Sequence, residues 1–329
     1  MNDRAVSLLE NYDIEVLRTW KGRGAILCES NKGILIFKEY SGPREKVLFQ
    51  NVLLNHVTEQ GGVNVENIIK NKEGQLLVDD QDGISYILKT YFEGRECNVR
   101  DMEECRMAVH TLAALHKASD LTNTEIMAGK TSFQVVNEYE KHNKELKKVR
   151  KFLKEKSQKT DFEIYLMKSY DYFYNLALQV TEELYFYTKE AGSTSSGLIC
   201  HGDYQYHNIL LSNNRWSLIN FEKCIIDNPV RDLYLFMRKL LEKSNWSQTV
   251  GDTLLSAYIA EREMVRADHI QLFYRLSYPE KFWKIVNFYY NSGKAWIPGK
   301  NLEKLEKLMD QEKDKQLFLT NYRSNYRLL

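Results

Sequence analysis

The residues best suited to chemistry lie in the stretch from Leu198 to Leu211. A His-Gly-Asp tripeptide ends at Asp203, and Asn208 follows it after four intervening residues. A carboxylate can accept the proton of an attacking hydroxyl, and an amide oxygen can coordinate the magnesium ion of a nucleotide. This spacing allows both side chains to point into one site from opposite ends of a tight turn. The sequence therefore predicts a phosphoryl-transfer loop in which Asp203 is the catalytic base and Asn208 is a metal ligand.

The residues that follow supply two further candidates. A turn at Asn213–Asn214 precedes a strand-like run from Trp216 to Phe221. Within it, Asn220 stands where a phosphotransfer site usually has a metal-binding aspartate. A neutral amide offers one oxygen and no charge, whereas magnesium favours carboxylates, so this difference is expected to weaken metal binding. Glu222 points to the same side if the strand stays extended, which makes it a candidate ligand that partly compensates.

Strand patterns earlier in the chain must position the groups that bind phosphate. The stretch Ile14–Tyr40 reads as consecutive antiparallel strands, with a hairpin turn at Asn31–Gly33. Lys38 lies late in the third strand, either as an ordinary solvated residue or as a lysine that pairs with nucleotide phosphates. Gly22 and Gly24 also allow two interpretations. They form a hairpin loop, or a flexible loop whose N–H groups cover phosphates.

A helical pattern begins at Pro43, with apolar residues on one face. Glu45 lies in its first turn, where a favourable interaction with the helix dipole suffices to explain it. Glu45 is also the best candidate for the carboxylate that orients Lys38 and thereby contributes to cofactor binding. Glu59 is a poorer substitute for that role.

Two more strand patterns, Ile68–Asp79 and Ile84–Phe92, complete a predicted five-stranded antiparallel sheet. The pattern after Phe92 is almost entirely helical, so we predict an N-terminal nucleotide-binding lobe over residues 1–92. A larger, mostly helical C-terminal lobe follows over residues 93–329 and contains the catalytic-type loop 201–222. The fold class is therefore α+β and bilobal. If the protein binds a nucleotide, the backbone of Thr90, Tyr91 and Phe92 meets the adenine edge.

Composition limits the choice of partners. The chain has 329 residues and a formal net charge of +1, so no global field favours nucleic acid or an anionic membrane. No run approaches the roughly 20 apolar residues of a membrane span, and the N-terminus shows no apolar signal region. We therefore expect no nucleic-acid partner, no membrane span, and cytoplasmic synthesis without a signal peptide.

The joint order of these features is more specific than any one of them. A β-rich region with a strand lysine precedes helices, the Asp203 loop, and a helix that begins near Asp232. This order resembles the aminoglycoside phosphotransferase and choline kinase branch of the protein-kinase-like fold, over most of the chain. Within that branch, several segments resemble the CotS family of bacterial spore coat proteins. These segments are His201–Asn208, Ile219–Glu222, Asp227–Leu233, Met237–Lys243 with Trp246, Tyr278–Trp283, Tyr289–Asn291 and Lys294–Trp296.

The resemblance implies a two-lobed kinase-like protein of the endospore coat, with other coat proteins as partners and with ATP and magnesium as cofactors. It assigns Asp203 as the base, Lys38 to the phosphates, Asn208 to the metal, and Asp232 to a structural role. The phosphate acceptor is then a hydroxyl of a small molecule or of a coat component. The alternative is a catalytically degenerate kinase fold that serves as a scaffold in the coat. Asn220 and the lack of a full Gly-rich phosphate motif favour this alternative.

Overall fold

A computed structural model describes residues 3–22, 24–121, 134–190, 198–291 and 298–328. The chain divides into two compact units. The first comprises residues 1–130, 198–226 and 257–262, and the second comprises residues 131–197, 227–256 and 263–329. The loop that carries Asp203 therefore belongs to the same unit as the N-terminal strands. The predicted lobe boundary near Phe92 stays a prediction.

The first unit contains the predicted five-stranded sheet, in the order β1-β2-β3-β6-β5. Its strands are β1 (Val16–Gly22), β2 (Ala25–Ser30), β3 (Gly33–Glu39), β5 (Val78–Asp79) and β6 (Ser85–Thr90), all paired antiparallel. Of the strand predicted over Ile68–Asp79, only an isolated bridge at Ile68 and the short strand β5 are formed, with a turn and irregular backbone between them. The side-chain oxygen of Asn71 accepts hydrogen bonds from the N–H groups of Glu73 and Gln75, and this local bonding competes with a strand ladder.

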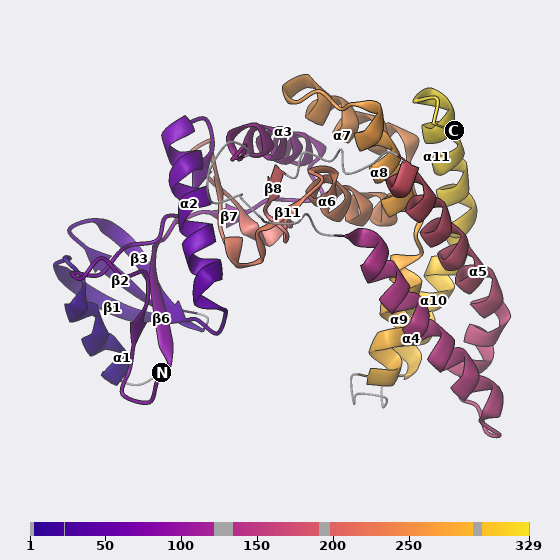
Figure 1. Ribbon diagram of the computed structural model, residues 1–329, viewed down its shortest axis with the longest axis horizontal. Helices are drawn as coiled ribbons and strands as arrows, with labels where there is room; N and C mark the ends of the chain where they lie inside the picture. Colours follow the sequence, from indigo (N-terminus) through magenta and orange to yellow (C-terminus); the bar gives the residue numbers. More distant parts are fainter. Residues whose placement is uncertain (1–2, 23, 122–133, 191–197, 292–297, 329) are drawn as a thin grey trace. The chain divides into compact units, whose positions relative to one another are not determined.

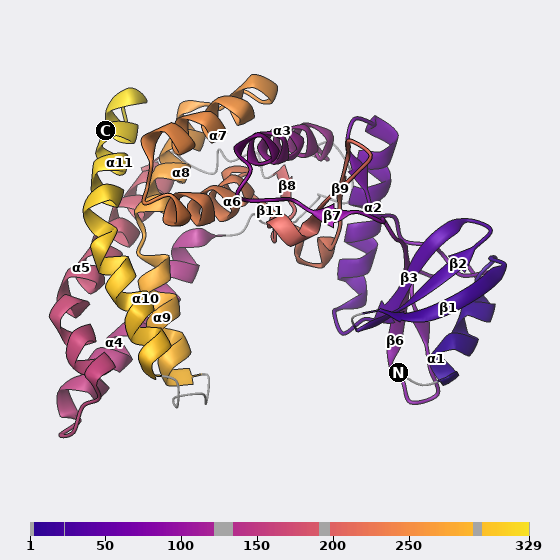
Figure 2. The ribbon, with the colours of Figure 1, turned by 180° about the vertical axis from the view of Figure 1, so that it is seen from behind.

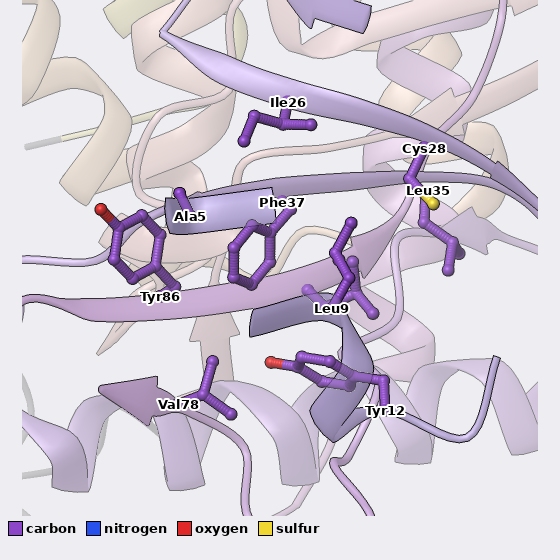
Figure 3. Packing of buried hydrophobic residues seen from close by; sticks show 10 residues of the cluster. Ala5, Leu9, Tyr12, Ile26, Cys28, Leu35, Phe37, Val78 and Tyr86 are labelled. Atoms are coloured by element: carbon purple, nitrogen blue, oxygen red, sulfur yellow. The ribbon is translucent and has the colours of Figure 1, made fainter. Parts of the chain in front are cut away.

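Alternation along the strands separates the two faces of this sheet. Leu35 and Phe37 of β3 and Leu88 of β6 belong to one buried apolar cluster, which also receives Leu9 and Tyr12 from the N-terminal segment (Figure 3). That segment forms α1 (Asp3–Ser7) and the 3₁₀ helix η1 (Leu8–Asn11). Because successive side chains alternate in direction, the residues between these apolar positions face the other side of the sheet.

The register between β3 and β6 brings two lysines onto that other face. Ile36 pairs with Lys89, and Lys38 pairs with Ile87. Directly opposed residues of an antiparallel pair share a face, so Lys38 and Lys89 are diagonal neighbours on one side of the sheet.

A second, four-stranded sheet of the first unit holds the catalytic-type loop. Its order is β4-β10-β9-β7, formed by β4 (Asn64–Val65), β7 (Arg95–Glu96), β9 (Ile209–Ser212) and β10 (Arg215–Leu218). Asn213 and Asn214 make the β9–β10 turn with positive φ angles of 48° and 60°, which asparagine tolerates. The predicted strand to Phe221 ends early, at Leu218. Asn220 is left-handed, with φ 65° and ψ 55°, and begins the 3₁₀ helix η4 (Phe221–Lys223).

The first unit contains further elements besides these two sheets. Helix α2 (Arg44–Gln60) begins where it was predicted, and it contacts β4 and η4. The others are α3 (Met102–Ala118), β8 (Leu198–Cys200), η3 (Tyr206–Asn208) and β11 (Ile225–Asp227), and β8 pairs with β11. Figure 1 labels most of these elements along the chain.

The second unit is helical, as predicted for the C-terminal part. Helices α4 (Val135–Glu155) and α5 (Asp161–Glu190) lie side by side in both views (Figures 1 and 2). The others are α6 (Val230–Lys243), most of α7 (Gln248–Glu261), α8 (Arg266–Ser277), α9 (Glu280–Asn291), α10 (Pro298–Asp310) and α11 (Glu312–Asn325). Asp232 is buried in the first turn of α6. The predicted motif residues Lys294–Trp296 lie outside the described residues. No described helix is long and apolar enough to cross a membrane.

Candidate active site

Gly202 sets the course of the loop that carries Asp203. Its φ is 79°, and a Cβ at this position would lie 2.0 Å from the carbonyl oxygen of Lys223. Only glycine accommodates both the left-handed backbone and this close approach. The loop therefore passes directly over Lys223, which places Asp203 beside the ammonium group of that residue.

Two buried side chains anchor the same loop. The backbone N–H of Asp203 donates to Nδ1 of His201 at 3.2 Å, and the other ring nitrogen lies 2.9 Å from the carbonyl oxygen of Ile219. Since Nδ1 accepts, Nε2 carries the proton and donates. The hydroxyl of Tyr204 donates to the carbonyl oxygen of Ala108 in α3 at 2.7 Å. His201 and Tyr204 are thus packing residues that fix the backbone on both sides of Asp203.

The Asp203 carboxylate is held in its charged form. Oδ2 lies 2.9 Å from Nζ of Lys223, and Oδ1 accepts a short hydrogen bond from Gln205. Burial alone would raise the pKa of Asp203, but the bond and charge of Lys223, together with Gln205, lower it below its usual range. Lys223 is 69 % exposed, so an approaching hydroxyl can take its place. The geometry provides an anionic proton acceptor at neutral pH.

The two predicted amide ligands lie in contact. Nδ2 of Asn220 donates to Oδ1 of Asn208 at 2.8 Å, and Nδ2 of Asn208 donates to the backbone oxygen of Asp203 at 2.8 Å. Oδ1 of Asn220 accepts from Nζ of Lys38 at 3.4 Å. A continuous chain of hydrogen bonds therefore links the backbone of Asp203 to the strand lysine, Lys38.

Lys38 has a carboxylate partner, but not the predicted one. Its Nζ lies 2.6 Å from Oε1 of Glu222, whereas Glu45 is exposed in the first turn of α2. The predicted pair of Lys38 with Glu45 is absent among the described residues. The early end of β10 explains the difference, because the turn η4 carries Glu222 back to the face of the sheet that bears Lys38.

Two further residues of the site have no counterpart in the sequence prediction. Nζ of Lys89 lies 2.7 Å from Oε1 of Glu222 and 2.9 Å from Oε1 of Glu66. Glu66 follows β4, which pairs in parallel with β10, and the same Oε1 accepts the N–H of Phe221 at 3.0 Å. The side chains of Lys89 and Glu66 are 0 % and 4 % exposed. The signal in the sequence was a single lysine directly after the apolar residues Ile87 and Leu88 and before Thr90.

The charges of this network are strongly coupled. Burial opposes ionisation of Glu222, but Lys89 and Lys38 outweigh it and lower the pKa of Glu222 to about 2. Burial also opposes the charge of Lys89 and would lower its pKa, but the carboxylates of Glu66 and Glu222 outweigh burial and raise the pKa of Lys89 above its usual value. Glu222 and Lys89 are therefore both charged at neutral pH.

The residues predicted to meet adenine lie at the end of β6. The N–H of Thr90 donates to the carbonyl oxygen of Asn67 at 2.9 Å, and that of Tyr91 donates to Ile34 at 3.0 Å. The N–H of Phe92 has no partner in the described part of the chain. Of the three backbone donors, Phe92 is the one open to a ligand.

The predicted metal ligands are of the chemical type that a magnesium ion prefers. Asn208, Asn220 and Glu222 supply only oxygen ligands, including one carboxylate, as magnesium prefers. In the structure, Oδ1 of Asn208, Oδ1 of Asn220 and Oε1 of Glu222 each accept from a protein donor. These residues fit the ion, and its binding must compete with contacts already made inside the site.

Comparison with known proteins adds to this geometry. A family model described as "Spore coat putative kinase YutH" matches residues 5–322. It supports the predicted spore coat and kinase-like assignment, with YutH as the matching family where the sequence suggested CotS. No curated protein matches the chain.

Solved structures of phosphotransferases resemble the whole chain. An aminoglycoside phosphotransferase from Alicyclobacillus acidocaldarius is 20 % identical with a TM-score of 0.81, covering 100 % of this chain and 97 % of that one. A spectinomycin phosphotransferase bound to ADP and spectinomycin is 13 % identical with a TM-score of 0.65, covering 94 % and 97 %. An amicoumacin kinase bound to AMP-PNP and calcium is 12 % identical with a TM-score of 0.58, covering 96 % and 94 %. At these identities the likeness shows the fold alone, and it confirms the predicted kinase-like class.

Proposed function

Because the chain belongs to the spore coat YutH family of kinase-like proteins, we propose that it is an ATP-dependent phosphotransferase. Its acceptor is a hydroxyl of a small molecule or of a coat component. One observation carries this proposal. Successive hydrogen bonds run from the backbone oxygen of Asp203 through Asn208 and Asn220 to Lys38, so the residue that carries the ionised carboxylate and a phosphate-binding cation lie in one site. The solved relatives with bound ADP and AMP-PNP support a nucleotide as the phosphate donor.

The reaction follows from these groups. The acceptor hydroxyl takes the place of Lys223 at the Asp203 carboxylate and donates its proton there. Its oxygen forms a bond to the γ-phosphorus while the bond from that phosphorus to the β-phosphate oxygen breaks, and ADP leaves. Lys38 neutralises phosphate charge, and the open N–H of Phe92 contacts the adenine edge. Catalysis of this kind depends mainly on positioning and on charge neutralisation.

Asn208, Asn220 and Glu222 are the residues that would hold magnesium, which when bound neutralises charge on the phosphates. Lys38 and the backbone N–H of Phe92 form the proposed nucleotide contacts, while Thr90 and Tyr91, whose N–H groups are bonded within the protein, only flank them. The exposed position of Glu45 leaves it at most a peripheral contribution.

The family also supports a location. We propose that the protein resides in the endospore coat with other coat proteins as partners, and that the CotS-like motifs reflect a shared ancestry with that family. Labelling the chain with a fluorescent protein and imaging sporulating cells tests the location. Fluorescence that stays in the cytoplasm of the mother cell and never outlines the spore would contradict the proposed coat location.

The activity is tested by magnesium-dependent ATP turnover in the presence of candidate acceptors. Asp203→Ala removes the base and is expected to lower turnover about 100-fold or more, while the thermal shift produced by ADP stays close to that of the wild type. Asp82→Ala, at an exposed turn, is the matched control and retains full turnover. Equal, slow turnover by the wild type and Asp203→Ala would refute catalysis by this site.

One observation favours the alternative of a scaffold without catalysis. The groups that would bind metal and phosphate already satisfy one another, through Asn220 with Asn208 and through Glu222 with Lys38. A scaffold requires no nucleotide, so it predicts no thermal shift with ATP and magnesium and an unchanged coat location for Asp203→Ala. A large shift that Lys38→Met abolishes excludes this alternative.

A further inference from the structure

Lys89 lies inside the proposed nucleotide site, yet the proposed reaction does not use it. We propose that Lys89 is a positioning residue: it holds the charge of Glu222, so that Lys38 can leave that carboxylate for the phosphates of a nucleotide. This inference rests on the proposed nucleotide binding and adds to it a residue that acts through Glu222.

The two lysines share one carboxylate oxygen. Nζ of Lys38 lies 2.6 Å and Nζ of Lys89 lies 2.7 Å from Oε1 of Glu222. They reach it from adjacent strands, since β3 and β6 pair with Ile36 opposite Lys89. When one lysine moves away, the other remains as the counter-ion of Glu222.

Burial determines which lysine can move. The side chain of Lys38 is 22 % exposed, whereas that of Lys89 is 0 % exposed. A phosphate group in the solvent can therefore attract Lys38 but cannot reach Lys89. The structure assigns ligand contact to Lys38 and retention of Glu222 to Lys89.

Glu66 keeps Lys89 in this role. It contacts Lys89 at 2.9 Å and also accepts the N–H of Phe221 at 3.0 Å, directly beside Glu222 in the chain. The same carboxylate thus fixes both the lysine and the backbone that carries Glu222. A lone buried lysine would be costly, and the paired carboxylate offsets that cost.

The consequence for binding follows from the charges. With Lys89 present, transfer of Lys38 to phosphate leaves Glu222 paired. Without Lys89, Lys38 is the one cation among the described residues that contacts Glu222. A nucleotide must then break that pair and leave an uncompensated carboxylate near its own phosphates. Loss of Lys89 should therefore weaken nucleotide binding only while Glu222 is charged.

A double change avoids leaving one buried charge alone. We replace the buried pair together in Glu66→Gln/Lys89→Met, because removing only one partner of such a pair is strongly destabilising. The glutamine keeps an oxygen that can accept the N–H of Phe221. A triple variant adds Glu222→Gln. Lys32→Met, from an exposed ion pair with Asp13, is the matched control.

The readout is the dissociation constant of ADP by calorimetry with EDTA present, so that contacts between lysine and phosphate are measured without metal. We expect the double variant to bind ADP about tenfold more weakly than the wild type and the triple variant to recover to within about threefold. Lys32→Met should bind as the wild type does. The free energy of unfolding of each variant is measured in urea in parallel.

A purely structural role for Lys89 gives a different pattern. The double variant then loses stability but binds ADP as the wild type does, or its weaker binding persists in the triple variant. Either result overturns the inference and leaves the proposed function intact. A wild type that binds no ADP, with or without magnesium, overturns the proposed function and this inference with it.

Discussion

Ionisation of Glu222 should make the free energy of unfolding of this protein fall at acid pH, by an amount that follows from its contacts with two lysines. Its pKa falls from an ordinary value of 4.5 to about 2 because two lysines outweigh the opposing effect of burial. The difference between those two values, at 1.36 kcal/mol per pKa unit, corresponds to about 3 kcal/mol of stabilisation at neutral pH. Only 28 % of the side chain is exposed, so solvent screens little of this energy.

The sign follows from proton binding. Below pH 4.5 the unfolded chain binds a proton at this residue that the folded chain does not, so this contribution is present above pH 4.5 and is lost as the pH falls toward about 2. At pH 3 about 2 kcal/mol of it should be gone. Glu222→Gln cannot titrate, so the stability difference between wild type and variant should shrink by that amount between pH 6 and pH 3.

The measurement is urea denaturation of both proteins at the two pH values. Glu29→Gln is the control, since Glu29 pairs with Arg18 at an exposed position and an exposed pair contributes about 1 kcal/mol or less. Its difference from the wild type should stay nearly constant with pH. If the difference for Glu222→Gln is the same at pH 6 and pH 3, the assignment of two lysines to this carboxylate is wrong.

Two further changes test the loop and its substituted ligand. Gly202→Ala should lower the free energy of unfolding, measured in urea, clearly more than Gly33→Ala does. Both positions have positive φ, which costs an alanine about 1–2 kcal/mol, but only the Cβ at Gly202 would meet a backbone oxygen, at 2.0 Å. Equal losses for the two variants would contradict the close approach to Lys223. Asn220→Asp should tighten manganese binding in the presence of ADP by about tenfold, or about 1.4 kcal/mol, because it adds a carboxylate to the ligand set. Aspartate tolerates the left-handed backbone that Asn220 adopts, so the change should not disturb the turn. An unchanged manganese affinity by calorimetry would remove Asn220 from the ligand set.

Local patterns sufficed to predict most of the first sheet and the loop. The alternation around Phe37 and the turn before Gly33 identify strands because both depend on neighbours in the chain. Asp203 and Asn208 are close in sequence, so their joint placement follows from one short turn. The structure brings them together with Lys38, as the predicted order of elements requires.

The partners of Lys38 could not be predicted in the same way. A strand extended to Phe221 leaves Glu222 at the end of a ladder, whereas the left-handed Asn220 ends the strand and turns Glu222 toward Lys38. The pair of Glu66 with Lys89 joins residues 23 positions apart and depends on the parallel contact of β4 with β10. No local periodicity encodes such a contact, and a lysine directly after two apolar residues is its only trace.

The charges around position 220 explain why an asparagine fits there. In the described site, Lys38, Lys89 and Lys223 face Glu66, Glu222 and Asp203 at contact distance, so three cations meet three carboxylates. An aspartate at position 220 would add a fourth negative charge beside Lys38 and would compete with Glu222 for it. The amide instead accepts one hydrogen bond from Lys38 and leaves the ion pair to Glu222. In the mechanism proposed above, Glu222, two residues further along the chain, supplies the charge that an aspartate would bring at position 220. The buried Lys89 then remains in contact with Glu222 when Lys38 moves to a nucleotide.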